Sequence, residues 1–188
     1  MPDFTTGPEL SYTSILGGGG WLGGLSPLES QKLLEEAVAM ARDVVAAHPH
    51  DASAHLVLGN ALLSLGNLVE AVVEYRMAIK IDPNVTGAHT NLARALQSKG
   101  KLDEAIAEFQ AALKINPSDP ARHLNLANAY RLGGRWDEAV VEYLEFLRVN
   151  PKDSLAHSRL GYVYAKQGKV LESAREYDHA ETRELPNL

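Results

Sequence analysis

Four histidines recur at a fixed interval and are the first residues of this sequence that could do chemistry. They stand 34 residues apart, in the segments SAHL, GAHT, ARHL and LAHS: His55, His89, His123 and His157. Imidazole rings bind metal ions and carry protons near neutral pH. Either chemistry would bring the rings together, because zinc ligands lie about 2.0 to 2.1 Å from the metal and proton transfer needs hydrogen-bond contact. The origin of the interval therefore decides between these roles and simple packing.

The interval belongs to a repeat of the whole chain rather than to the histidines alone. Glycine supplies the left-handed conformation that ends a helix, and proline cannot continue one. Each repeat is therefore expected to form a helix, a turn, a second helix and a turn. The recurring positions are Leu58, Leu92, Leu126 and Leu160, the glycines Gly66, Gly100, Gly134 and Gly168, the aromatic residues Tyr75, Phe109, Tyr143 and Tyr177, and the prolines Pro83, Pro117 and Pro151.

With the DEA segments after the turn glycines, these positions resemble the tetratricopeptide repeat. The resemblance covers residues 52–85, 86–119, 120–153 and 154–188, the last range including the C-terminus. It implies an all-α fold, a right-handed superhelix (solenoid) of antiparallel helix pairs. Residues 26–51 resemble a truncated repeat with one helix, which Ser26, Pro27 and Glu29 should start. Counting that helix, we expect about nine, preceded by a glycine-rich N-terminal arm, residues 1–25.

The repeat separates the histidines. Equivalent helices of successive repeats should lie on the order of 10 Å apart, so four equivalent rings can share neither a metal ion nor a proton relay. We therefore expect each ring to pack between helices, either neutral or wet enough to titrate near pH 6.5. The glycines of GGGGWLGG lack the spacing of a nucleotide-binding fingerprint. We predict no metal, no cofactor and no enzymatic activity.

The amino-acid composition limits the classes of partner that the protein is expected to bind. The formal net charge of -6 disfavours nucleic-acid binding, which needs a basic surface. There is no cysteine, and neither a signal peptide nor a membrane-spanning stretch is recognisable. A cytoplasmic protein without direct membrane insertion is expected, with attachment to a larger or membrane-associated complex through a partner left open.

Positive charge collects on the first helices of the second, third and fourth repeats, and none of the four first helices contains an acidic residue. In the resembled family these helices line a concave groove. Asparagine amides can pair with the backbone of an extended peptide, and arginine or lysine can select carboxylates. We predict a protein–protein interaction module, an adaptor or assembly factor holding an extended acidic segment. The alternative is that these polar groups only solvate an exposed face. The candidate groove residues are Asn60, Asn91, Arg94, Asn125, Asn128, Arg131, Arg159, Tyr162 and Lys166.

The N-terminal arm combines glycines with scattered large apolar side chains. Its candidate contact residues are Phe4, Tyr12, Trp21 and Leu22. We expect the arm to dock in a groove of its own chain, of a second copy or of a larger assembly. This supports a second function hypothesis, a structural subunit of a large complex or filament that contacts its neighbours through the arm and the last helix.

Overall fold

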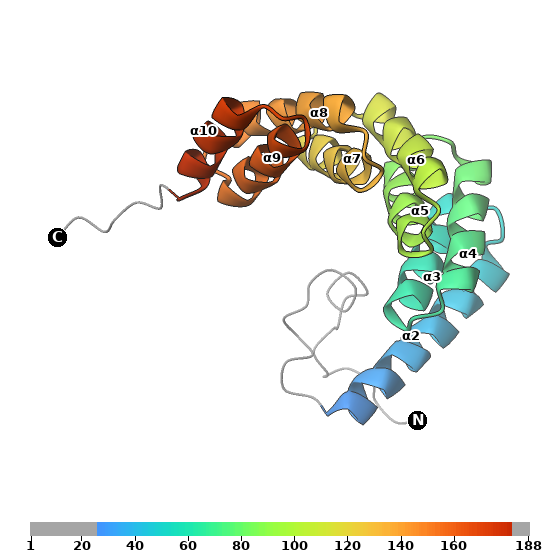
Figure 1. The fold of residues 1–188 in the computed structure, drawn as a ribbon. Helices are drawn as coiled ribbons and strands as arrows, with labels where there is room; N and C mark the ends of the chain where they lie inside the picture. The colour runs from blue at the N-terminus through green and yellow to red at the C-terminus, as the bar shows by residue number, and fades with distance from the viewer. Residues whose placement is uncertain (1–25, 182–188) are drawn as a thin grey trace, which may run out of the picture. The chain divides into compact units, whose positions relative to one another are not determined.

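The computed structural model describes residues 26–181, which form nine helices and no strand (Figure 1). The chain divides into two compact units, with the boundary between Ile81 and Asp82. The all-α class with antiparallel helix pairs is confirmed. The helices are α2 (Pro27–Ala47), α3 (Ala52–Ser64), α4 (Leu68–Ile81), α5 (Thr86–Ser98), α6 (Leu102–Ile115), α7 (Pro120–Leu132), α8 (Trp136–Val149), α9 (Ser154–Lys166) and α10 (Val170–Glu181).

The first unit contains α2, α3 and α4. Helix α2 starts at the predicted capping box: the Ser26 hydroxyl accepts from the backbone N–H of Glu29, and the Glu29 carboxylate accepts from the backbone N–H of Ser26. Helix α2 packs against α3, and α3 pairs with α4. The described part of this unit, residues 26–81, thus holds one complete helical hairpin and one additional helix before it.

The second unit contains three hairpins in succession, α5 with α6, α7 with α8 and α9 with α10. Helix α6 packs against α7, and α8 packs against α9, so each hairpin is stacked on the next. None of the nine described helices has the length and apolar character needed to cross a membrane.

The turn glycines have the backbone conformation that the sequence predicts. Gly66, Gly100, Gly134 and Gly168 all have positive φ, between 70° and 87°. The residue after each glycine donates its backbone N–H to a carbonyl five residues earlier, as from Asn67 to Leu62 at 2.8 Å. This bond satisfies a carbonyl at the helix end and reverses the chain within a few residues.

The last hairpin differs from the others because no described helix follows α10. Tyr177 is 37% exposed, whereas the equivalent Tyr75, Phe109 and Tyr143 are buried. Val170, at the start of α10, is 74% exposed. The face of α10 that the next hairpin would cover is therefore open in the described part of the chain.

Candidate functional site

Each of the four periodic histidines lies in the first turn of a first helix and bridges two neighbours. Nδ1 lies 2.6 to 2.7 Å from a glutamate Oε2 on the second helix of the same hairpin. Nε2 lies 3.0 to 3.1 Å from the carbonyl oxygen of the proline before that hairpin. The four sets are His55 with Glu74 and Pro49, His89 with Glu108 and Pro83, His123 with Glu142 and Pro117, and His157 with Glu176 and Pro151.

These contacts explain the interval. Three of the rings are buried and the fourth, His123, is half-buried, as the packing interpretation predicts. Each ring is held by its own carboxylate, and residues 26–181 contain no group of three His, Cys, Asp or Glu side chains that could hold a metal ion. The glutamates were not among the predicted site residues. The sequence nevertheless contains a pattern that could have identified these glutamates, because a glutamate follows each histidine by 19 residues in every repeat.

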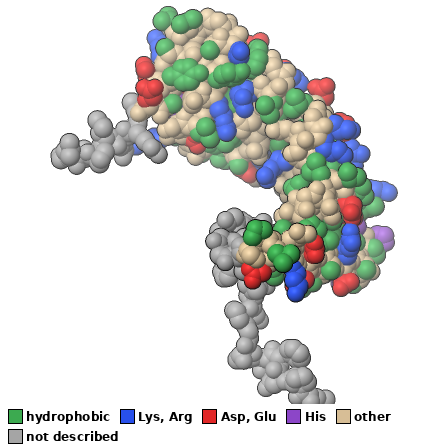
Figure 2. All heavy atoms as spheres, turned by 60° about the horizontal axis from the view of Figure 1, so that its bottom comes forward, with side chains coloured by type: hydrophobic (Ala, Val, Ile, Leu, Met, Phe, Trp, Pro, Cys, Tyr) green, Lys and Arg blue, Asp and Glu red, His purple; other side chains and the backbone are tan. Residues whose placement is uncertain are grey.

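The candidate groove residues lie on first helices, as expected. Asn60 is on α3 in the first unit, and the other eight are on α5, α7 and α9 in the second unit. These three helices contain arginine and lysine and no acidic residue, although the whole chain is acidic. Figure 2 shows Lys and Arg side chains gathered in patches on the face turned to the viewer. The second unit therefore presents basic first helices.

Arg131, Tyr162 and Lys166 come together in the second unit. Tyr162 is 40% exposed, and two cations lie over its ring: Cζ of Arg131 is 5.9 Å and Nζ of Lys166 is 5.3 Å from the centroid. The ring of Trp136 meets the same tyrosine edge to face at 6.3 Å. An exposed aromatic ring between two cations offers a flat contact surface and two positions for carboxylates.

Behind this cluster lies the buried Tyr143. Its hydroxyl donates to Oδ1 of Asn128 at 2.7 Å and accepts from Nε of Arg131 at 3.2 Å. Burial raises the pKa of Tyr143, and the charges of Arg131 and Arg159 partly oppose that rise. The hydrogen bond to the Tyr143 hydroxyl thus orients the Arg131 side chain.

This arrangement gives the asparagines an internal role that the sequence analysis did not foresee. The amide oxygen of Asn128 accepts from Tyr143, and that of Asn60 in the first unit accepts from Tyr75 at 3.0 Å. In the second repeat the aromatic residue is Phe109, which has no hydroxyl, and Arg94 occupies the asparagine position. Asn60 and Asn128 therefore satisfy tyrosine hydroxyls in addition to any partner they bind.

The remaining candidates are spread along the helices. Arg94 is exposed, whereas Asn91 and Asn125 are half-buried. A further residue joins two of the first helices: Arg122 on α7 donates from Nη1 to Oγ1 of Thr90 on α5 at 3.3 Å. Its Nε lies 3.2 Å from Oδ2 of Asp119. Arg122 is thereby neutralised, and it links α7 to α5 rather than facing a ligand alone.

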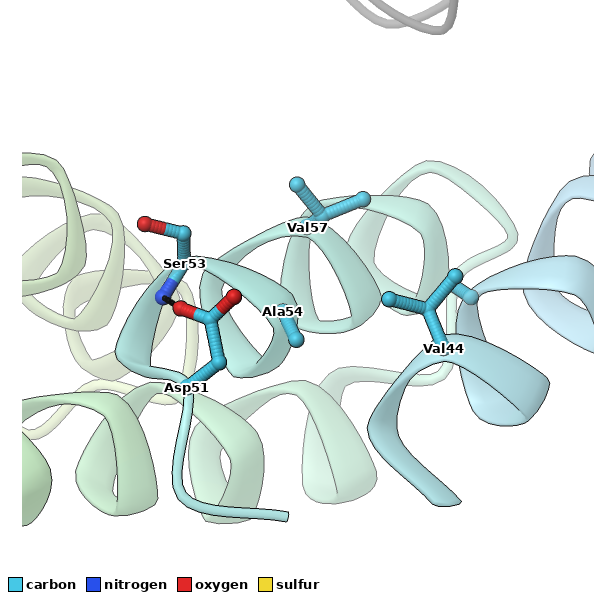
Figure 3. Close-up of a pocket in the computed structure, with 6 residues that line it drawn as sticks. Val44, Asp51, Ser53, Ala54 and Val57 are labelled. Atoms are coloured by element: carbon cyan, nitrogen blue, oxygen red, sulfur yellow. Dashed lines mark hydrogen bonds between the residues drawn. The ribbon is translucent and has the colours of Figure 1, made fainter. Parts of the chain in front are cut away.

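The first unit carries an apolar pocket of about 310 Å³ between α2 and α3 (Figure 3). Val44 of α2 and Ala54 and Val57 of α3 line it, and Asp51 closes one end, where its carboxylate accepts from the backbone N–H of Ser53. Val44 is 44% exposed. The equivalent residues of the complete repeats, Ala78, Ala112 and Phe146, are buried. The pocket thus lies beside α2, before which the described residues 26–181 contain no helix in the place of a complete repeat's first helix.

The predicted arm contacts Phe4, Tyr12, Trp21 and Leu22 lie outside the described residues.

Comparisons with known proteins agree with this geometry. Tetratricopeptide-repeat family models match residues 28–85 and 74–107, and a TPR-repeat model matches residues 93–133 and 127–168. No match is found among curated proteins.

Solved structures of low identity share the fold. A crystal structure of MamA has a TM-score of 0.75 at 20% identity, covering 81% of this chain and 89% of that one. MamA from Desulfovibrio magneticus RS-1 has a TM-score of 0.73 at 19% identity, covering 78% and 83%. YrrB, described as a TPR protein with an unusual peptide-binding site, has a TM-score of 0.72 at 20% identity, covering 81% and 79%. With the repeats, their turn glycines and these matches in agreement, the chain belongs to the tetratricopeptide-repeat family.

Proposed function

We propose that this protein is a non-catalytic interaction module whose second unit binds an extended segment rich in carboxylates. The observation that carries the proposal is the half-exposed ring of Tyr162 between Arg131 and Lys166. The basic first helices around it contain no acid that would compete for these cations. Family membership supports the general role, and the peptide-binding description of YrrB belongs to a protein of the same fold.

The chemistry of the cluster favours a carboxylate next to a flat or apolar group. The two cations attract the carboxylates of the partner, while the tyrosine face packs against its apolar atoms. Arg131 is already oriented by the Tyr143 hydroxyl, so less side-chain entropy is lost when a ligand binds it. Arg94 and Arg159 extend the same charge along α5 and α9.

Charge reversal at Lys166 tests the proposal. The probe is a fluorescein-labelled, unstructured peptide of alternating glutamate and alanine, and its glutamine counterpart measures the part of binding that depends on charge. We expect Lys166→Glu to weaken binding of the glutamate peptide about fivefold or more at low salt, because an exposed pair contributes up to about 1 kcal/mol and reversal adds repulsion.

The matched control is Arg148→Glu, which makes the same charge change on the exposed end of α8. It should leave the affinity almost unchanged. Equal weakening by both variants would reduce the effect to overall charge, and equal binding of the two peptides would contradict a carboxylate-reading surface.

The pocket of the first unit favours a second role, in assembly. We propose that residues 1–25 dock there, in the same chain or in a second copy, and place apolar side chains where a complete repeat would have its first helix. Support comes from the apolar lining and from the exposed Val44 at a position that is buried in the complete repeats. In this role the protein would act as a structural subunit that joins neighbouring copies.

Val57→Glu, which places a charge in the pocket, tests the assembly role beside deletion of residues 1–25. If the arm docks in a second copy, both changes should lower the mass measured by light scattering. If it docks in its own chain, both should lower the stability of the first unit and leave the mass unchanged. A deletion that alters neither quantity would contradict docking.

A further inference from the structure

In all four histidine contacts, both ring nitrogens face oxygen atoms. The proline carbonyl can only accept a hydrogen bond, so Nε2 must carry a proton to bond it. Nδ1 lies 2.6 to 2.7 Å from the glutamate oxygen, a distance typical of a charge-assisted hydrogen bond, and one proton must lie between these two atoms. The geometry therefore constrains the number of protons held at each contact.

Two arrangements of protons satisfy both bonds. In the first, the ring carries two protons and faces an ionised carboxylate. In the second, the ring carries only the Nε2 proton and the carboxyl group carries the other. Each holds one proton more than a neutral histidine with an ionised glutamate. Without that proton, a nitrogen lone pair would face an oxygen atom in a largely buried site, at the cost of an unsatisfied buried group.

We infer that the four His–Glu pairs are proton-binding sites that the folded chain keeps loaded at a pH where the histidines of the unfolded chain are neutral. The formal charge of the chain, -6 with every histidine neutral, becomes -2 when the four sites are loaded. Each proton joins the second helix of a hairpin, through the histidine on its first helix, to the loop that enters the hairpin. Proton binding and hairpin closure are thus coupled.

Other titratable and charged groups lie near the rings. At His157, Glu176 on α10 is the bonded carboxylate, and the ring of His179 on the same helix lies 5.1 Å away. On the same helix as His157, burial raises the pKa of Tyr164, and the negative charges of Glu176 and Glu172 raise it further. Nζ of Lys169 lies 5.6 Å from the centroid of the Tyr164 ring.

The other sites have similar neighbours. Near His123, the basic Arg122 is paired with Asp119. Near His55, the carboxylate of Asp51 accepts from the backbone N–H of Ser53 at the helix start. Near His89, the loop carboxylate is that of Asp82, which accepts from the backbone of Asn84. The carboxylates that face these three rings from the second helix are those of Glu74, Glu108 and Glu142.

Proton binding at the four sites makes the stability of the fold depend on pH in one direction. The folded chain binds more protons than the unfolded chain, so the equilibrium constant for unfolding rises with pH. The rise begins above about pH 6.5, where the histidines of the unfolded chain lose their protons. Its limit is about tenfold per pH unit for each retained proton, until the folded site itself releases the proton.

The direct test counts the protons released when the full chain unfolds in denaturant in a weakly buffered solution at about pH 7.5. Loaded sites should release about four protons per chain, because unfolded histidines are mostly neutral at that pH. Glu142→Gln should release about one proton fewer. The glutamine amide can donate to Nδ1 of a neutral His123 while Nε2 still donates to Pro117, so both bonds persist without the extra proton.

Glu145→Gln is the matched control, since it removes a carboxylate three residues away on α8 that pairs with Arg148 at the surface. It should release the same number of protons as the parent chain. Equal release by all three proteins would overturn the inference.

Ring ¹⁵N NMR of the parent chain near pH 7.5 gives a reading that does not depend on a variant folding. Four rings with protons on both nitrogens support the inference, as do four Nε2–H rings whose glutamate side chains show protonated carboxyl groups in ¹³C NMR, whereas Nε2–H rings beside ionised carboxylates would overturn it. Rings that are neutral with a proton on Nδ1 and a bare Nε2 would overturn it.

Discussion

The ring of Tyr75 lies directly against Gly59: a β-carbon on Gly59 would lie 2.6 Å from Cε1 of that ring. The tyrosine is fully buried, and its hydroxyl donates to Asn60. The two helices of the first complete hairpin can approach this closely only because position 59 has no side chain. The equivalent pairs are Ala93 with Phe109, Ala127 with Tyr143, and Gly161 with Tyr177.

We predict that Gly59→Ala lowers the free energy of unfolding by up to about 2 kcal/mol. Overpacking costs about 1 to 3 kcal/mol, and replacing glycine in a helix returns about 1 kcal/mol of that cost. Gly161→Ala is the comparison and should be milder, because the nearest contacts of its β-carbon, the Ser173 carbonyl oxygen, Cε1 of Tyr177 and Cβ of Glu176, lie at 3.2 to 3.3 Å. Urea unfolding followed by circular dichroism compares the two, and equal effects would contradict the role of the buried ring.

Removing the Tyr143 hydroxyl should also be costly. Tyr143→Phe leaves the Asn128 oxygen and the Arg131 Nε without their shared partner, and we expect a loss of about 1 to 2 kcal/mol in unfolding free energy. Tyr177→Phe removes a hydroxyl at the equivalent position of the last repeat, where the ring is partly exposed, and should be nearly neutral. If Tyr143→Phe is as mild as Tyr177→Phe, the hydroxyl does not hold the cluster together.

The same tyrosine predicts a loss of stability at alkaline pH. Burial raises the pKa of Tyr143 above its ordinary value of 10.0. Above about pH 10 the phenol ionises in the unfolded chain but stays neutral in the folded chain, which favours unfolding. Its contribution is complete below pH 10 and is lost as pH rises through the folded value. Unfolding free energies measured from pH 9 upward should therefore fall less steeply in Tyr143→Phe than in the parent chain; identical slopes would exclude Tyr143 as the cause.

Local sequence signals predicted the helices and their turns well. Gly66 and its three equivalents adopt positive φ, and Ser26 and Glu29 form the capping box. Such features depend on residues a few positions apart, whose geometry within a helix or a turn is nearly invariant. The 34-residue interval then carried the same prediction through every repeat.

Contacts between helices were harder to predict. The glutamates at 74, 108, 142 and 176 recur as regularly as the histidines, but their pairing depends on how far one helix is shifted along its neighbour. The internal bonds of Asn60 and Asn128 have the same origin, because a tyrosine hydroxyl reaches across the hairpin. The pocket beside Val44 depends on how α2 packs against α3, which no residue in the sequence marks directly.

The recurrence of one histidine–glutamate–carbonyl contact per repeat has a consequence for cooperativity. If the hairpins open together, the steepness of the pH response scales with the number of repeats, while its midpoint is set by the chemistry of a single contact. Inserting or deleting a 34-residue repeat would therefore change the Hill coefficient of the transition without moving its centre.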